Sequence, residues 1–235
     1  MVNRLIAILA LLAIVFGEPL PVNFDSYTQW PGCVRPVPFQ EKCVSMWAHV
    51  TARMISDRYC VSKKVHYEFS PQSLISCSKA SKRCDGFFDV DELTKSVSEQ
   101  GVLDSNCVKY TGTNETACPS KCDGAGNFTW YKATCKSYNS MPEDLIKGEI
   151  MKNGPVACFD DYFKTFDDYN TGIYYNVGLQ KYPIKQAFRV VGWGRENGIN
   201  FWIASAALSD SFGENGNVRL KIKDNFCSTV LVCNP

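Results

Sequence analysis

Twelve cysteines in a chain of 235 residues are the feature that most limits how this sequence can fold. An even number of cysteines at irregular spacing is typical of a disulfide framework formed in an oxidising compartment. Zinc binding is the alternative, but the short cysteine pairs are only CPSKC and CSTVLVC, and the chain has two histidines, His49 and His66. We therefore expect a disulfide-rich fold with no metal site and no cofactor.

The first 17 residues have the pattern of a secretory signal peptide. Arg4 is followed by the apolar run LIAILALLAIVF, residues 5–16, and then by the small residue Gly17. This run of 12 residues is too short to cross a bilayer as a helix, and no later apolar stretch is long enough. We predict cleavage after Gly17, no membrane anchor, and a protein that is secreted or delivered to a lysosome-like vesicle.

The composition excludes some classes of partner. A net charge of +1 gives no electrostatic basis for binding nucleic acid or a membrane surface. A hydrophobic fraction of 45% is sufficient for the core of one large domain or two small lobes. Two N-glycosylation sequons, NET at Asn114 and NFT at Asn127, indicate an exposed polar loop.

The first half of the chain has mainly helical patterns. Apolar residues spaced as on one face of a helix predict an amphipathic helix that starts near Cys43 or Val44, with Met46 off the apolar face. Ser70 followed by Pro71 predicts a second helix, over SPQSLISC. Two more helices are expected, at residues 89–101 and 141–154.

After Pro155 the sequence changes to short runs rich in β-branched and aromatic residues, separated by Gly, Asn and Pro. These runs are PVACFDDYF, TGIYYNV, QAFRVVGWG, NFWIASAA and NVRLKI. Helices followed by strands indicate an α+β domain over residues 18–235. We expect a helical lobe at about 24–130 and a β lobe at about 131–235, with any ligand site between them.

Several motifs, in order along the chain, resemble papain-like cysteine proteases of the cathepsin B type. They are FDSYTQWPGC, QEKCVSMWA, ISDRYC, SPQSLISC, IMKNGPV, YNTGIYY, VVGWGRENGINFW and FGENG. The resemblance implies a papain-like two-lobe fold, with an N-terminal mainly helical lobe, a C-terminal β-barrel-like lobe and a cleft between them.

The resemblance also implies where catalytic residues should lie. The family uses a Cys at the start of the first helix, a His base, an Asn that orients the His, and an upstream Gln that donates to the oxyanion. The matching positions hold Met46, Gln186 and Ala206, and only the Gln, Gln40, is kept. A thioether has no proton to lose and an amide is no base near neutral pH, so we predict that peptidase activity is lost.

The cleft positions that match the family also differ. Bulkier or less polar residues replace glycines, a small pocket residue, a tryptophan and an acidic pocket residue, which predicts a partly filled cleft. These residues are Phe87, Phe159, Ile184, Lys185, Leu208 and Val230.

Three other side chains could in principle replace the lost catalytic groups. Ser45 should point about 100° away from Met46 on a helix. We interpret His49 as a core or helix-face histidine and place His66 in a loop. Neither histidine has a nucleophile at a recognisable spacing.

The resemblance implies four disulfides, namely Cys33–Cys60, Cys43–Cys84, Cys77–Cys118 and Cys107–Cys122. It leaves Cys135, Cys158, Cys227 and Cys233 unassigned, and the last two could close a small C-terminal loop.

Three functions remain open. The first is a secreted, catalytically inactive homologue that acts as a monomer by binding a protein, such as a protease inhibitor, an active relative or an extracellular receptor. The second is an active cysteine-type endopeptidase with unorthodox residues. The third is a structural secreted protein.

Overall fold

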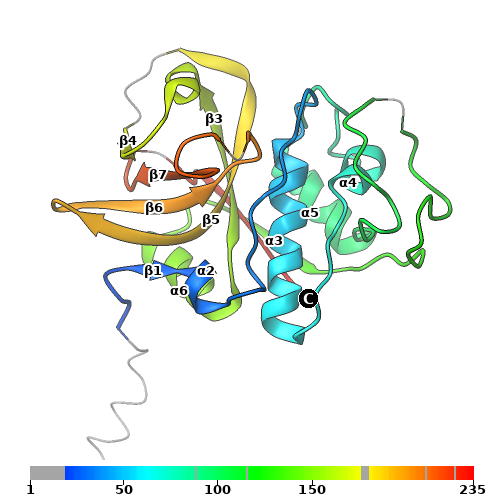
Figure 1. Cartoon of the computed structure of the whole chain (residues 1–235), viewed down its shortest axis with the longest axis horizontal. Helices are drawn as coiled ribbons and strands as arrows, with labels where there is room; N and C mark the ends of the chain where they lie inside the picture. Colours follow the sequence, from blue (N-terminus) through cyan, green and yellow to red (C-terminus); the bar gives the residue numbers. More distant parts are fainter. Residues whose placement is uncertain (1–18, 88, 115, 176–179, 210, 225) are drawn as a thin grey trace, which may run out of the picture.

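The computed structural model places a sheet and a group of helices on either side of one long central helix (Figure 1). The central helix is α3 (Met46–Lys63), and α4 (Pro71–Cys77) and α5 (Val90–Glu99) lie on the side away from the sheet. The predicted signal peptide, residues 1–17, lies outside the described residues. The structure describes residues 19–87, 89–114, 116–175, 180–209, 211–224 and 226–235.

Helix α3 begins later than predicted, at Met46, with Ser45 as its N-cap. The two residues proposed as its start are held in other contacts. Cys43 forms a disulfide with Cys84. Val44 forms a β-bridge with Asp85, and the Val44 N–H donates to the Cys84 carbonyl at 3.0 Å. Because these contacts fix an extended backbone, Met46 becomes the first helical residue.

The other predicted helices are confirmed. Ser70 caps α4 by accepting a hydrogen bond from the Ser73 N–H at 3.2 Å, and Asp89 caps α5. Gly101, with φ of +99°, follows the end of α5. The remaining helical segments are α2 (Ser26–Gln29), α6 (Glu143–Asn153) and the 3-10 turn η1 (Lys164–Asp168).

The strands form one sheet in the order β2-β8-β3-β5-β6-β7-β4, in which β4 and β7 are parallel and the other pairs antiparallel. The five predicted runs correspond to β3 to β7, whereas β2 and β8 were not predicted. The strands are β2 (Thr134–Asn139), β3 (Val156–Phe163), β4 (Ile173–Tyr174), β5 (Lys181–Glu196), β6 (Ile199–Ser205), β7 (Asn217–Lys221) and β8 (Thr229–Asn234).

The N-terminal segment crosses to the sheet. Strand β1 (Phe24–Asp25) pairs with β5, with Phe24 opposite Trp193 and their rings stacked at 4.9 Å. The predicted helical lobe from about residue 24 to 130 therefore starts with a segment that belongs to the sheet.

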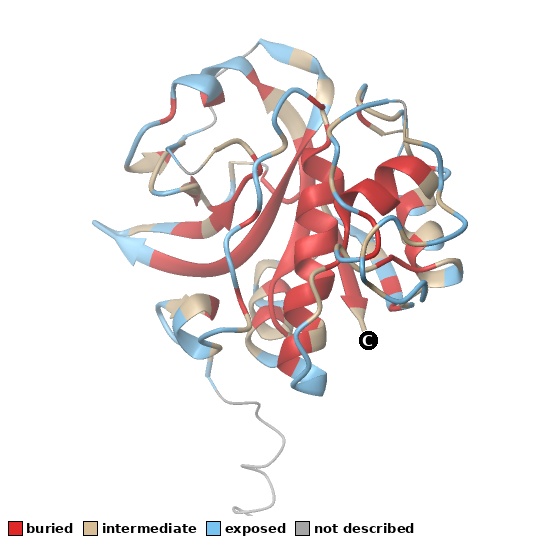
Figure 2. Cartoon of the chain, turned by 45° about the vertical axis from the view of Figure 1, so that its right-hand side comes forward, coloured by how far each residue is buried: buried red, intermediate tan, exposed pale blue. Residues whose placement is uncertain are grey.

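Helix α3 is buried on all sides over most of its length, because it packs against both the sheet and the other helices (Figure 2). Its residues from Met46 to Arg58 are all buried. Met46 is 4% exposed and belongs to the core, although it lies off the predicted apolar face. No helix in the described part of the chain is long and apolar enough to cross a membrane.

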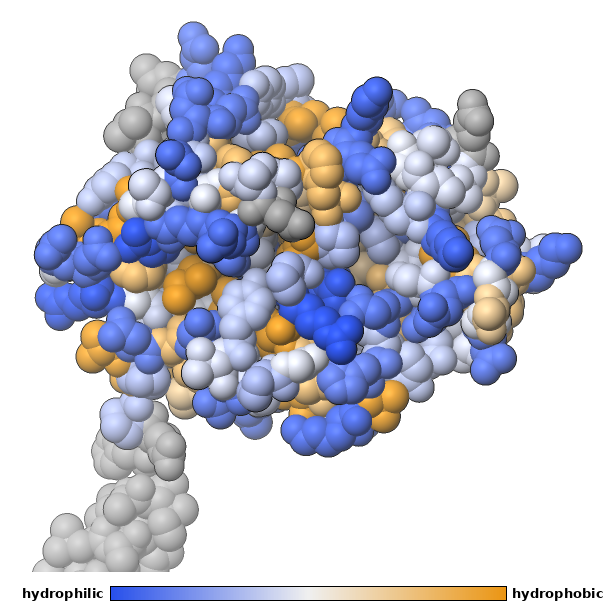
Figure 3. All heavy atoms as spheres, viewed as in Figure 1, coloured by the Kyte–Doolittle hydropathy of each residue, from blue (hydrophilic) through white to orange (hydrophobic). Residues whose placement is uncertain are grey.

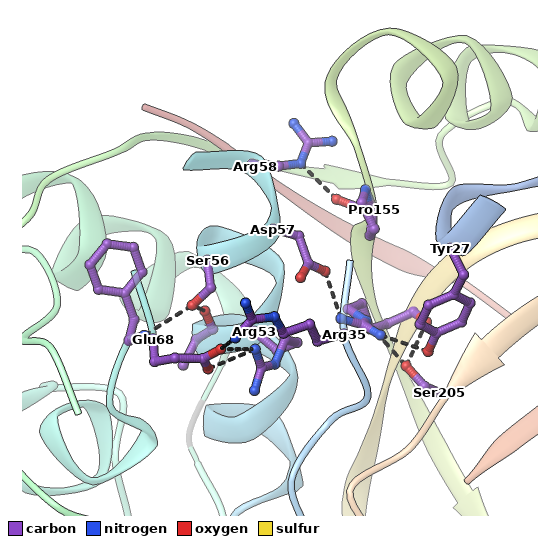
Figure 4. Close-up of polar contacts among 12 residues, drawn as sticks. Tyr27, Arg35, Arg53, Ser56, Asp57, Arg58, Glu68, Pro155 and Ser205 are labelled. Carbon is purple, nitrogen blue, oxygen red and sulfur yellow. Dashed lines mark hydrogen bonds and ion pairs between the residues drawn. The ribbon is translucent and has the colours of Figure 1, made fainter. Parts of the chain in front are cut away.

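A buried ion pair joins α3 to the sheet. The Arg189 guanidinium of β5 donates to the Asp57 carboxylate of α3 at 2.6 Å, and both side chains are fully buried. Arg189 also donates to the hydroxyls of Ser205 at 3.1 Å and Tyr27 at 2.9 Å. Asp57, Ser205 and Tyr27 are labelled in Figure 4, where they converge from three segments of the chain.

Arg58 links the same part of α3 to the end of α6, the residues before β3 and the end of β8. Its guanidinium donates to the carbonyls of Pro155 at 2.6 Å and Gly154 at 2.9 Å, and to the side chains of Glu149 and Asn234. Because Asn234 ends β8, this arginine ties the C-terminal strand to the central helix.

Six disulfides use all twelve cysteines, and the four predicted pairs are confirmed. The suggested Cys227–Cys233 loop is wrong, because the structure has Cys135–Cys233 and Cys158–Cys227 instead. Residues 229–234 form an extended strand, and six residues of strand span roughly 20 Å, far more than a disulfide can bridge. Cys135 and Cys233 are register partners on the paired strands β2 and β8.

Candidate functional site

Met46 and Gln40 lie together at the N-terminal end of α3. The Gln40 Oε1 accepts a hydrogen bond from the Ser45 N–H at 2.9 Å, and the Gln40 N–H donates to the Ala207 carbonyl at 2.9 Å. The Tyr110 hydroxyl donates to the Gln40 carbonyl at 2.5 Å. Gln40 is thus held beside the start of α3, where the resemblance places the oxyanion donor.

Gln186 and Ala206, which the resemblance places at two other catalytic positions of the family, lie on β5 and directly after β6. Gln186 is 0% exposed, and neither atom of its amide has a hydrogen-bond partner among the described residues. Ala206 is buried and offers only a methyl group. Leu208, two residues further on, is half-buried and packs against the core. No group at these positions can accept a proton near neutral pH or orient such a base.

A cavity of about 230 Å³ lies beside Met46. Gln40, Trp47, Ile184 and Lys185 line it together with Met46, so the start of α3 and the residues before Gln186 share one cavity. The far wall contains two tyrosines that sequence reasoning missed, Tyr162 and Tyr182, whose hydroxyls donate to Asp167 at 2.7 and 2.5 Å.

A second cavity, of about 220 Å³, lies on the other side of Lys185. Phe87 and Phe159 line it, with their ring centroids 5.4 Å apart, and the Phe87 ring also stacks on Trp47 at 5.5 Å. Its polar wall includes Asp89, Asp91, Ser228 and Thr229. The replacements thus occupy part of the cleft, and a cavity remains on each side of Lys185.

Val230 does not line either cavity. It is fully buried in β8, where it pairs with Tyr138 and Cys158. Adjacent side chains in a strand point to opposite faces, so Thr229 faces the cleft and Val230 faces the core. Val230 is therefore a core residue rather than a lining residue of the cleft.

Asp160 is a buried carboxyl next to the site that sequence reasoning missed. It pairs with Gln186 in the sheet, and its carboxylate accepts hydrogen bonds from the backbone N–H groups of Cys227 and Ser228. Burial raises the pKa of Asp160 to about 6, although these hydrogen bonds favour the charged form. The adjacent acidic pair in PVACFDDYF was the only available signal, since the side that Asp160 faces depends on the strand pairing.

Lys185 is exposed and carries a charge at the rim shared by the two cavities. It donates to the Asp161 carboxylate at 2.5 Å, and Lys181 contacts the same carboxylate. The hydrogen bonds from Lys181 and then Lys185 lower the pKa of Asp161. The cleft rim therefore carries an ion-pair network of two lysines around one carboxylate.

The alternative catalytic candidates do not reach the site. The Ser45 hydroxyl is buried, donates to the Cys43 carbonyl at 3.2 Å and lies 3.0 Å from the Tyr110 hydroxyl. His49 is buried at 1% exposure, which confirms its interpretation as a core histidine. Burial, followed by the nearby charge of Arg53, lowers the pKa of His49 to about 3.

His66 is exposed and lies beside a disulfide rather than in the cleft. Its Nδ1 lies 3.3 Å from the Cys60 Sγ. The potential ligand atoms of Cys33, Cys60 and His66 lie within 4.8 Å of one another. The two sulfurs are bonded to each other, and a disulfide provides no thiolate ligands.

Both predicted glycosylation positions are exposed. Asn127 lies in the loop after Cys122, and Asn114 accepts a hydrogen bond from the Cys84 N–H through its Oδ1 at 2.7 Å. Their exposure is compatible with modification, and glycosylation stays a prediction.

A helical half and a sheet on either side of a buried central helix, with a cleft at the N-terminal end of that helix, define a two-lobe α+β protein. The sequence profile described as "Papain family cysteine protease" matches residues 20–231, which is most of the chain. The protein belongs to the papain family of cysteine proteases.

Its similar proteins are of the cathepsin B type. It is 29% identical over 222 residues to "Cathepsin B-like CP1" of Giardia intestinalis, covering 89% of this chain and 71% of that protein. It is 30% identical over 234 residues to the "Gut-specific cysteine proteinase" of Caenorhabditis elegans, covering 88% and 70%. The solved structure of "proCathepsin B S9 from Trypanosoma congolense" is 28% identical, with a TM-score of 0.84 over 94% of this chain and 81% of that chain. These similarities support the predicted α+β, papain-like fold.

Proposed function

We propose that this chain is a catalytically inactive cathepsin B-like homologue that is secreted, or delivered to a lysosome-like vesicle, and acts by binding a protein in its cleft. The observation that carries the proposal is the set of side chains at the family's catalytic positions, Met46, Gln186 and Ala206. A thioether cannot become a thiolate, a carboxamide cannot act as the base, and a methyl group cannot orient one. All twelve cysteines are in disulfides, so no free thiol elsewhere offers a replacement.

The cleft is the part of the molecule best suited to binding. Its two cavities have aromatic walls and flank the exposed cation of Lys185. On the face seen in Figure 3, hydrophobic residues otherwise occur in small groups between hydrophilic ones. The partner is a protein whose segment enters the cleft: a protease inhibitor, an active relative or an extracellular receptor.

Two other functions make different predictions. The names of the similar proteins favour an active cysteine peptidase, which would turn over peptides and react with thiol-directed inhibitors. A structural secreted protein would neither turn over peptides nor bind a partner in the cleft.

The first test measures turnover of cathepsin B peptide substrates by the purified protein. We expect no turnover above the blank and no labelling by an epoxide thiol inhibitor, because losing catalytic groups that act as a unit costs about 10⁶ in turnover. The double variant Met46→Cys, Gln186→His is measured alongside. Turnover by the parent that persists in Met46→Ala would overturn the proposal and favour the peptidase alternative.

The second test measures binding of a protein inhibitor of papain-family proteases. Lys185→Glu reverses the charge between the two cavities and should weaken binding at least tenfold, whereas Lys95→Glu, at an exposed position of α5, should leave it unchanged. Binding that is equal in parent and Lys185→Glu would place the contact outside the cleft. A parent that binds neither this inhibitor nor an active cathepsin B would favour the structural alternative.

A further inference from the structure

A third cavity, of about 210 Å³, lies in the helical lobe away from the cleft. One face of α3 lines it with His49, Ala52 and Arg53, which are spaced to lie side by side on a helix. Tyr110 and Lys109 line it from the loop after Cys107. None of its lining residues lines either of the two cleft cavities, so it is a separate site.

Two buried polar side chains of this cavity have nitrogen atoms without a hydrogen-bond partner in the described residues. Neither ring nitrogen of His49 has a hydrogen-bond partner in the described residues, although the ring is 1% exposed. The Nε of Arg53, a residue 8% exposed, also has none. Buried polar groups in folded proteins are nearly always hydrogen-bonded, so orphaned groups beside a cavity point to something that occupies it.

The charges around the cavity favour an anion. The only carboxylate that lines it in the described residues, Glu68, accepts hydrogen bonds from both Arg35 and Arg53, and Figure 4 shows Arg53 extending toward Glu68. Lys109 is exposed and has no ion-pair partner in the described part of the chain. Two cationic side chains, Arg53 and Lys109, therefore line the cavity. Its one carboxylate, Glu68, is already hydrogen-bonded to two arginines.

The hydrogen-bonding groups that line the cavity also favour an anion. His49 is a neutral imidazole, because burial lowers its pKa to about 3, so one of its nitrogens carries a hydrogen to donate. Arg53 Nε and Lys109 Nζ add further donors, and the rest of the wall includes the apolar side chains of Phe69 and Ala52. A ligand that satisfies this wall has acceptor oxygens at one end and a compact apolar body.

We propose that this cavity binds a small monocarboxylate with a compact apolar body. Its carboxylate oxygens accept hydrogen bonds from His49, from Arg53 Nε and from Lys109, and its apolar body packs against Phe69 and the Tyr110 ring. The inference is independent of the function proposed for the cleft, because it uses none of the cleft residues.

The test uses the fact that the chain has two histidines. Protein labelled with ¹⁵N-histidine is titrated with benzoate while the ring signals of His49 and His66 are followed by NMR. We expect benzoate to shift the His49 signals saturably and to leave those of His66 in place, and the neutral isostere benzamide to bind at least tenfold more weakly. No saturable shift of His49 at millimolar benzoate would overturn the proposal.

Variants provide a second readout, with benzoate binding measured by calorimetry. Lys109→Gln removes an exposed charge and should weaken binding roughly fivefold, whereas Lys95→Gln on α5 should not change it. His49→Phe keeps an aromatic ring in place of the imidazole and should weaken binding at least about tenfold. If Lys109→Gln and the parent bind benzoate equally, the proposal fails, whether or not the His49→Phe variant folds.

Discussion

The two ends of helix α3 differ in how their buried polar groups are satisfied. At the far end, Arg58 donates to four partners and Asp57 Oδ2 is paired with Arg189, although Asp57 Oδ1 has no hydrogen-bond partner in the described residues. At the cleft end, the indole N–H of Trp47 and both nitrogens of His49 have no partner in the described residues. The charged groups of the far end thus hold the lobes together, whereas at the cleft end the polar groups of two whole side chains have no partner in the described residues. Natural proteins break such rules mainly at sites with a function.

The largest expected effect comes from breaking the ion pair at the far end. Arg189→Met leaves the Asp57 carboxylate buried without its partner, and we expect a loss of roughly 3–5 kcal/mol in the free energy of unfolding, measured in urea. The matched control is Arg35→Met, which breaks an exposed ion pair with Glu68 and should cost about 1 kcal/mol or less. Equal losses in the two variants would show that the buried ion pair at the far end contributes no more to stability than an exposed one.

The next prediction concerns the pH dependence of stability, to which one buried carboxyl near each end of α3 contributes. Burial raises the pKa of both Asp57, at the far end, and Asp160, near the cleft, to about 6, against 3.8 in the unfolded chain. Burial lowers the pKa of His49 to about 3, so the contribution of His49 to stability rises with pH up to about 6.5. The two carboxyls bind protons more tightly in the folded state, so their own contribution to stability is largest below pH 4 and declines as pH rises to about 6. At 1.36 kcal/mol per pH unit, each carboxyl contributes roughly 3 kcal/mol to this decline.

Urea unfolding between about pH 4 and pH 7 measures this decline. Asp160→Asn cannot ionise, so the excess stability of the parent over this variant should fall by roughly 3 kcal/mol across this interval, because Asp57 and His49 contribute equally to both proteins. A stability difference between the parent and Asp160→Asn that stays constant or grows as pH rises would contradict the prediction for Asp160.

Much of the fold could be predicted because its signals are local. The N-caps Ser70 and Asp89 act within their own helices, and four disulfides followed from matched positions. Strand β2 was missed because its residues are mostly exposed and polar, so only its pairing with β8 defines it. The same pairing decides the partner of Cys233, which no local pattern shows.

The sequence predicted which residues lie at the candidate site but not their environment, and the predicted loss of catalysis stays a prediction. The identities of Met46 and Gln186 were enough to predict lost catalysis. The full burial of Gln186 and the missing partners of His49 depend on how α3 packs between the lobes. A periodicity argument that assumes one exposed face cannot predict burial on all sides, which is also why Met46 was placed off the core.

A comparison of two buried glutamines sharpens the contrast between satisfied and unsatisfied groups. Both are 0% exposed, but Gln72 donates to Ser76 at 3.2 Å and accepts from the Thr111 N–H at 3.1 Å, whereas Gln186 has no hydrogen-bond partner among the described residues. We expect Gln72→Leu to destabilise the protein by about 1–3 kcal/mol and Gln186→Leu to stabilise it by about 1–2 kcal/mol. Urea unfolding measures both, and a loss of stability in Gln186→Leu would mean that its amide has a partner, such as a buried water.

The smallest expected effect concerns Met46 itself. If this side chain now only packs in the core, Met46→Leu conserves volume and should change the free energy of unfolding by less than about 1.5 kcal/mol. Binding of the protein inhibitor should also be unchanged, since both side chains present an apolar wall to the cavity beside Lys185. A larger loss of stability, or a tenfold loss of inhibitor binding, would show that the unbranched thioether has a specific role at the position where the family has its nucleophile.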